Sequence, residues 1–154
     1  MANEQQLKDI TERTFELINA GDIDSLNEVY TDDFTYRTTS GIEAHGLDEF
    51  KQLWSVYNDA FSDLEFVLEE IFIEGNRGVS LYRMTGKQTG DFQGIEASNN
   101  DVDVLFCSIG TFDDDGNIVD VYDVSDTFDL LRQLDALPSD VSDFGDVTGT
   151  RTGA

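Results

Sequence analysis

The spacing of hydrophobic residues changes partway along the chain, and this change limits the folds that the chain can adopt. Up to Phe61 most apolar residues recur every three or four positions, whereas from Leu64 to Ser125 they recur mainly at every second position. The first spacing is typical of amphipathic helices and the second of β-strands. Strands that follow one another closely pair most simply as antiparallel neighbours. The sequence therefore predicts an α+β fold with a mostly antiparallel sheet.

The helical part divides into three helices. Asn3 and Gln6 are spaced as a capping box, and the helix that they begin continues to Gly21. Asp22 is the expected N-cap of a shorter second helix, which a strand over 34–38 follows. A polar loop over 39–46 then leads to a third helix over 47–61, which has an aromatic stripe.

The second part predicts two hairpins and a final helix. Strands are expected over 64–73, 77–85, 102–112 and 118–125, and a short helix over 127–134. The residues 86–100 form a polar connection that contains glycine. In the strand over 102–112, apolar side chains occupy both faces, so both faces should be covered. Because the helices can cover only one of them, we expect a second subunit on the other.

The net charge restricts the partners of the chain. Nine Lys and Arg side chains face 33 Asp and Glu, for a formal net charge of −24. Nucleic acid and anionic membranes would repel such a chain, so neither is expected as a partner. Hydrophobic residues make up 39% of the sequence, which is too many for an acidic disordered chain. We expect adaptation to molar salt, where screening weakens the repulsion between charges.

The length of 154 residues suits one domain, which we place at 1–137. The residues 138–154 are expected to form a flexible acidic tail. A single cysteine, Cys107, cannot form an internal disulfide, and no secretory signal or membrane-spanning run is apparent. These features favour a cytoplasmic protein.

Three segments resemble a known family. They are 18–34, with the sequences INAGD and YTDDF at its two ends, TGKQTGDFQGI at 85–95, and 115–134, which begins DGNI and ends LRQL. In this combination and order they resemble the SnoaL-like polyketide cyclases of the nuclear-transport-factor-2-like and ketosteroid-isomerase-like superfamily. The resemblance covers about residues 6–137.

The resemblance implies a cone-shaped curved sheet that helices close around an apolar pocket, with the exterior of the sheet often forming a homodimer. It also implies a reaction without metal or other cofactor on a small apolar molecule. In the cyclases of this family, an Asp near the end of the last strand removes a proton next to a carbonyl group. Asp126 is the matching position in this chain.

Each candidate catalytic residue also has a structural explanation. Asp126 precedes the last helix, where Asp is a common N-cap, but a carboxylate in an aromatic pocket would be a stronger base. Alternation along the strand would place Tyr122 on its face and Asp123 on the other, where a solvated charge is the simpler interpretation. Gln88 and Tyr36 could donate hydrogen bonds to an enolate oxygen, or lie in a loop and in the core respectively.

The candidate pocket wall is mostly aromatic, although each of its residues could equally pack in the core. Its members are Trp54, Tyr57 and Phe61 on the third helix, with Phe92, Phe106 and Met84 elsewhere. Several cyclases of the family carry histidine where this chain has Gln88 and Arg37, and the one histidine here is His45. The acid partner of a cyclisation is therefore unassigned. A ligand-binding or scaffold protein without catalytic activity remains the alternative to a cyclase or isomerase.

Overall fold

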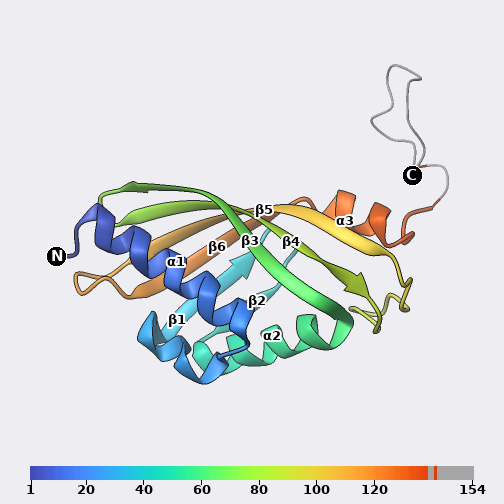
Figure 1. The fold of residues 1–154 in the computed structure, drawn as a ribbon, viewed down its shortest axis with the longest axis horizontal. Helices are drawn as coiled ribbons and strands as arrows, with labels where there is room; N and C mark the ends of the chain where they lie inside the picture. Colours follow the sequence, from blue (N-terminus) through green and yellow to red (C-terminus); the bar gives the residue numbers. More distant parts are fainter. Residues whose placement is uncertain (139–140, 142–154) are drawn as a thin grey trace, which may run out of the picture.

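The computed structural model describes residues 1–138 and 141, and the predicted tail lies almost wholly outside them. In chain order the elements are α1 (Glu4–Ala20), the 3₁₀ helix η1 (Ile23–Glu28), β1 (Tyr30–Thr38), β2 (Glu43–His45), α2 (Leu47–Ala60), β3 (Phe61–Glu74), β4 (Arg77–Gln88), β5 (Asp101–Phe112), β6 (Ile118–Ser125) and α3 (Thr127–Gln133). The predicted α+β class is confirmed. The strands form one curved, open sheet (Figure 1).

The six strands lie in the order β2-β1-β6-β5-β4-β3. β1 and β6 pair in parallel, and the other neighbouring strands are antiparallel. β6 therefore lies between β1 and β5, and its side chains have neighbours on both sides. Asp123 on β6 is level with Thr38 of β1 and with Ser108 of β5.

Local sequence signals explain the boundaries of α1. The Asn3 side chain accepts a hydrogen bond from the backbone N–H of Gln6 at 2.9 Å, and the Gln6 side chain accepts one from the Asn3 N–H at 2.9 Å. This confirms the predicted capping box. Gly21 ends the helix at a φ of 70°, a left-handed conformation that glycine adopts without strain.

Several details of the predicted elements were wrong. β3 begins at Phe61 instead of Leu64, and β4 continues to Gln88, where a polar connection was expected from residue 86. Asp22 makes no capping hydrogen bond, because the helix that follows it is a short 3₁₀ helix. β1 begins at Tyr30 instead of Phe34, and the polar loop contains the short strand β2. β2 is three residues long and pairs with β1 over Thr35–Arg37, so too few residues alternate for a strand to be detected in the sequence.

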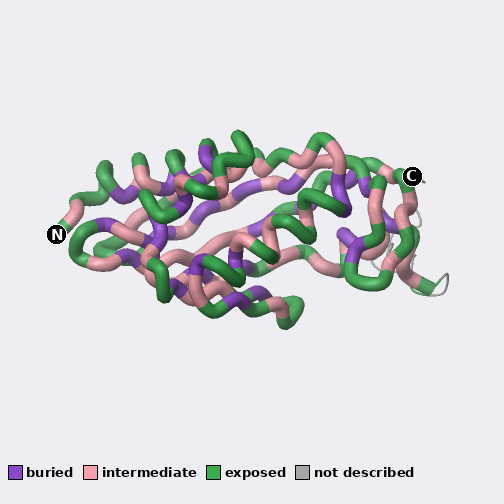
Figure 2. The backbone as a smooth tube through the Cα atoms, turned by 90° about the horizontal axis from the view of Figure 1, so that it is seen from below, coloured by how far each residue is buried: buried purple, intermediate pink, exposed green. Residues whose placement is uncertain are grey.

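Helices α1 and α2 pack against the inner face of the sheet, and α3 lies at the far end beside β5 (Figure 1). Burial alternates along the strands (Figure 2), most regularly in β4, where Gly78, Ser80, Tyr82 and Met84 are buried. The core has two clusters. One gathers residues of α1, η1, β1 and α2, and the other surrounds Phe61, Met84 and Phe106. The inner face of the sheet between α1 and α2 holds the cavity described below.

Candidate active site

An apolar cavity lies between the inner face of the sheet and helices α1 and α2. Its volume is about 110 Å³. That is several times the space needed for one water molecule. The wall contains Thr11, Thr14, Phe15 and Ile18 of α1, Tyr30 and Tyr36 of β1, Phe50, Leu53, Trp54 and Tyr57 of α2, and residues of β3 to β6. A ligand here would be enclosed mainly by aromatic and aliphatic side chains.

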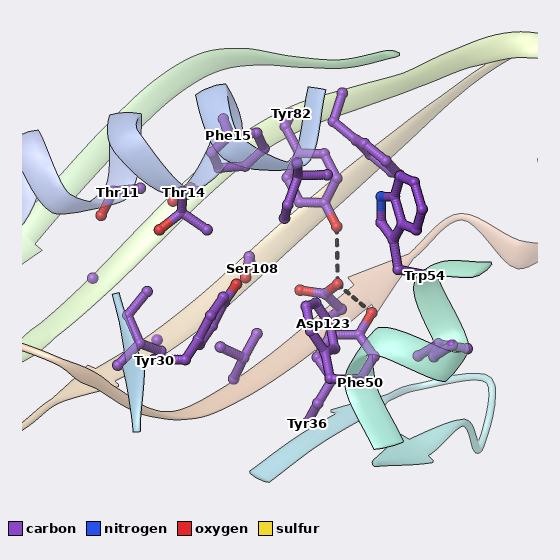
Figure 3. Close-up of a pocket in the computed structure, with 18 of the residues that line it drawn as sticks. Thr11, Thr14, Phe15, Tyr30, Tyr36, Phe50, Trp54, Tyr82, Ser108 and Asp123 are labelled. Carbon is purple, nitrogen blue, oxygen red and sulfur yellow. Dashed lines mark hydrogen bonds between the residues drawn. The ribbon is translucent and has the colours of Figure 1, made fainter. Parts of the chain in front are cut away.

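Asp123 is the acidic residue in this wall, and 3% of it is exposed. Its Oδ2 accepts a hydrogen bond from the Tyr36 hydroxyl at 2.7 Å and another from the Tyr82 hydroxyl at 2.9 Å. The two tyrosines reach the carboxylate from β1 and β4 (Figure 3). They fix its orientation.

The other carboxylate oxygen of Asp123, Oδ1, is free. It is buried and has no hydrogen-bond partner among the residues that the structure describes. The Ser108 hydroxyl is near enough to favour the charged carboxylate, although its geometry does not make it a hydrogen-bond partner of Oδ1. A buried oxygen without a donor is costly unless a ligand or water supplies one. Oδ1 is therefore the polar atom available to a molecule in the cavity.

The environment makes Asp123 a stronger base than an exposed aspartate. Burial raises the pKa of its carboxyl group, and the hydrogen bonds from Tyr36 and Tyr82 and the nearby Ser108 hydroxyl oppose this shift in part. Burial and the negative charge of Asp123 raise the pKa of Tyr36 and Tyr82 well above the ordinary value, and they raise the pKa of Tyr57 to about 12. The tyrosines therefore stay neutral and remain donors.

Aromatic contacts hold the two donors in place. The Tyr82 ring stacks on Phe106 with 5.2 Å between centroids, and Phe15 meets its edge at 5.1 Å. Tyr36 packs against Phe50 at 5.1 Å. Each donor thus comes from a strand and is supported by a neighbouring ring, which restricts the rotation of its side chain.

Comparison with known proteins identifies the family of the chain. A sequence model of the SnoaL-like polyketide cyclase family matches residues 8–134. The chain belongs to the SnoaL-like polyketide cyclase family. No match was found among curated proteins.

Several solved structures share the fold. A protein from Jannaschia sp. CCS1 assigned as a SnoaL-like polyketide cyclase is 28% identical, with a TM-score of 0.79 over 88% of this chain and 95% of that one. TsrD from Streptomyces laurentii is 23% identical, with a TM-score of 0.79 over 89% and 100%. AclR from Streptomyces galilaeus, assigned as a hydroxylase, is 21% identical, with a TM-score of 0.77 over 88% and 100%. Because structures with this fold carry different assigned activities, the reaction must be argued from the site.

Four of the residues predicted from the sequence meet in the SnoaL-like cavity, namely Tyr36, Trp54, Tyr57 and Asp123. Asp126 does not. Its side chain is exposed and accepts a hydrogen bond from the Asp129 N–H at 3.0 Å, so it caps α3. Of the two roles left open for Asp126, the structure shows the N-cap. The expectation that Asp123 lies on the face away from the pocket was wrong, because β6 turns Asp123 inward together with Val121.

The other predicted residues lie outside the cavity wall. Gln88 is fully buried, where its amide donates to the Ile95 carbonyl at 3.2 Å and accepts from the Ser98 N–H at 3.0 Å, so it braces the loop after β4. Arg37 lies with its guanidinium 4.9 Å from the centre of the Tyr122 ring, away from Asp123. Phe61, Phe92, Phe106 and Met84 pack in the second core cluster.

Several wall residues were missed, and some had a detectable signal. Along the buried side of β5 the residues change from Val104 and Phe106 to Ser108 and Gly110, and along β4 they change from Tyr82 to Ser80 and Gly78. Small residues at core-facing positions leave space beside the sheet. Within the described ranges 1–138 and 141, no cluster of His, Cys, Asp and Glu suits a metal ion, and no helix is long and apolar enough to cross a bilayer.

Proposed function

We propose that this protein is an enzyme that removes a proton from carbon next to a carbonyl group of an apolar molecule, with Asp123 as the base. The observation that carries the proposal is the buried carboxylate with Oδ2 held by Tyr36 and Tyr82 and Oδ1 free toward the cavity. Proton abstraction of this kind is the first step of an aldol-type cyclisation or an isomerisation. The reaction needs no metal, because the carboxylate accepts the proton directly.

Asp123 Oδ1 takes the proton, the electron pair of the C–H bond forms a carbon–carbon double bond, and the carbonyl oxygen receives the π electrons as an enolate. The apolar wall supports this role, since a desolvated carboxylate with a raised pKa is a more effective base. The two tyrosines keep Oδ1 oriented while the proton moves.

Hydrogen–deuterium exchange tests the proposal. The probe is 2-tetralone, an apolar bicyclic ketone with acidic C–H bonds, incubated with the protein in D₂O and followed by NMR. A general base contributes roughly 100-fold or more, so Asp123→Asn should lower the exchange rate by about that factor. Asp126→Asn is the matched control, because its carboxylate is only three residues away but lies outside the cavity.

Equal exchange rates for the wild-type protein and Asp123→Asn would overturn the catalytic proposal. If the protein then still binds apolar ketones, it is a ligand-binding protein without catalytic activity, which is the second candidate. Mass spectrometry of compounds that remain bound after purification at high salt would identify the natural ligand class. A consistent apolar carbonyl compound would support the enzyme.

We also propose a homodimer through the outer face of the sheet in a salt-adapted cytoplasmic protein. By strand register, Phe72, Val79, Ile109 and Tyr122 form one row across β3 to β6 on this face. Phe72 is 59% exposed, and Val67, Leu105 and Val124 are also exposed on this face. Such a patch favours association. Phe72→Glu should halve the mass measured by sedimentation equilibrium at molar potassium chloride, and a monomeric wild-type protein would exclude the dimer.

A further inference from the structure

Tyr30 is a cavity residue that the mechanism above does not use. It is 7% exposed and lies at the start of β1, with its ring stacked on Phe34 at 4.4 Å and tilted against Phe50 at 5.4 Å. Figure 3 shows it on the Ser108 side of the Asp123 carboxylate, with its hydroxyl turned into the cavity. Its backbone and ring are therefore fixed while the hydroxyl faces the ligand space.

The Tyr30 hydroxyl has no hydrogen-bond partner in the part of the chain that the structure describes. This is unusual, because the hydroxyl of a buried tyrosine normally finds a partner. The cavity hydroxyls of Tyr36 and Tyr82 are already bound to Asp123 Oδ2. Those of Thr11 and Thr14 donate to carbonyl groups of their own helix at 2.8 and 2.9 Å. Tyr30 thus has a donor to spare beside the free Oδ1.

Four other donors line the wall, namely the Ser80 and Ser108 hydroxyls and two groups from α2. The Ser108 hydroxyl favours the charged form of Asp123, and the two groups from α2 are less constrained. The Trp54 indole N–H and the Tyr57 hydroxyl come from α2, and both side chains are only half-buried. Trp54 also lines a second pocket together with the exposed residues Asn19 and Asn58, so water can reach it. Tyr30 does not line that second pocket, and its ring lies among core residues of β1 and α2.

We propose that Tyr30 is a further catalytic residue, whose hydroxyl donates a hydrogen bond to the ligand oxygen that becomes negatively charged. This inference rests on the proposed function. When Asp123 Oδ1 takes the proton from carbon, the negative charge moves from the carboxylate to the enolate oxygen. The neutral Tyr30 hydroxyl then stabilises that oxygen, and its own proton stays on Tyr30. This supplies the donor for which the sequence offers no histidine.

The electrostatics are consistent with this role. Burial raises the pKa of Tyr30, and the negative charge of Asp123 raises it further, so the hydroxyl lies within the field of the carboxylate and keeps its proton. A donor fixed before the reaction stabilises developing charge without having to reorganise. The substrate is therefore a ligand whose carbonyl oxygen lies toward Tyr30 and whose acidic carbon lies toward Asp123.

A binding experiment tests Tyr30 separately from catalysis. The probes are 2-naphtholate, a planar anion that imitates an enolate, and naphthalene, which has the same ring system without oxygen. Both are titrated into Asp123→Asn, in which a neutral amide imitates the protonated aspartate. A hydrogen bond to a charged group is strong enough that adding Tyr30→Phe should weaken naphtholate binding about tenfold or more. Naphthalene binding should change less than twofold.

Two further variants in the Asp123→Asn background make the test specific. Tyr122→Phe removes a hydroxyl outside the cavity and should leave both affinities unchanged. Tyr36→Phe should weaken naphtholate binding less than Tyr30→Phe does, and an equal or larger loss would assign the anion to Tyr36 and overturn the proposal. Equal loss of naphtholate and naphthalene in Tyr30→Phe would also overturn it, because the role of Tyr30 would then be packing alone.

The result is distinguishable from failure of the proposed function. Selective loss of naphtholate in Tyr30→Phe together with unchanged deuterium exchange in Asp123→Asn would support the anion-binding hydroxyl and reject the base. Loss of exchange in Asp123→Asn with no naphtholate effect in Tyr30→Phe would support the base and reject Tyr30.

Discussion

Asp123 and Asp126 lie only three residues apart, yet they occupy opposite environments. Asp123 is buried at the end of β6, where two tyrosines bind one oxygen and the other faces the cavity. Asp126 is exposed at the start of α3 and binds a backbone N–H of its own helix. The same functional group is thus suited to chemistry in one place and to helix capping in the other. Burial and hydrogen-bond partners make the difference.

The largest effect on this contrast should come from removing the hydroxyls that hold Asp123. The hydrogen bonds from Tyr36 and Tyr82 lower the pKa of the carboxyl group, so the double variant Tyr36→Phe/Tyr82→Phe should raise that pKa. Because catalysis needs the ionised carboxylate, the acidic limb of the exchange rate should move to higher pH. At a pH below the shifted limb, the exchange rate of the double variant should therefore be about tenfold or more lower than that of the wild-type protein.

The measurement is the rate of 2-tetralone exchange as a function of pH for the wild-type protein, the two single variants and the double variant. The single variants should give smaller shifts in the same direction. A limb at unchanged pH, combined with a lower plateau, would show that the tyrosines act on the ligand instead of on Asp123.

The sequence predicted the fold better than the site, and β6 shows why. Spacing identified the strand over 118–125, but both of its faces carry apolar residues, Val121 on one and Tyr122 and Val124 on the other. Alternation alone could not decide which face was inside. The aromatic Tyr122 suggested the wrong one, since its ring packs with Arg37 instead of lining the cavity.

The pairing of β6 with β1 and β5 decides which of its faces points to the cavity, and that pairing depends on the tertiary fold. Asp123 is level with Ser108 on β5, which belongs to the side that faces α1 and α2. The helical aromatic stripe, by contrast, gave Trp54 and Tyr57 correctly, because one amphipathic helix can turn only one face to the sheet. Gln88 could not be assigned from sequence, since its partners Ile95 and Ser98 depend on the path of a loop.

A second test compares the stability effects of the two carboxylates. Burial raises the pKa of Asp123 in the folded protein, so the folded state holds its proton to higher pH than the unfolded chain does. The resulting stabilisation is complete below the ordinary value of 3.8 and is lost as the pH rises through the folded-state pKa. Asp123→Asn, which stays neutral, should therefore be more stable than the wild-type protein at pH 7.

Urea unfolding of Asp123→Asn at several pH values checks this expectation. The gain in the free energy of unfolding should shrink as the pH falls toward 3.8. A gain that does not depend on pH would mean that the charge of Asp123 costs nothing in the folded protein. It would also weaken the case for Asp123 as an activated base, because a carboxylate whose charge costs nothing in the folded protein does not have a raised pKa.

Asp126 should respond in the opposite sense and more weakly. Asp126→Ala removes the acceptor for the Asp129 N–H, so it should lower the free energy of unfolding by about 1 kcal/mol. Deuterium exchange of 2-tetralone should not change, since the cavity keeps all its groups. Asp126→Ser, which retains a capping oxygen, should restore most of the stability. A loss of exchange activity in Asp126→Ala would break the assignment of the two aspartates to separate roles.

The smallest expected effect is that of salt on the protonation of Asp123. The net charge of −24 is carried mostly by exposed side chains, whose repulsion molar potassium chloride screens over roughly 3 Å, so the melting temperature should rise steeply with salt. Asp123 is shielded from solvent ions by the cavity wall, and two tyrosine hydroxyls bind its carboxylate. The acidic limb of exchange should therefore stay at nearly the same pH from low to molar salt. An acidic limb that shifts clearly in pH between low and molar salt would show that solvent ions reach Asp123 as they reach the exposed Asp126.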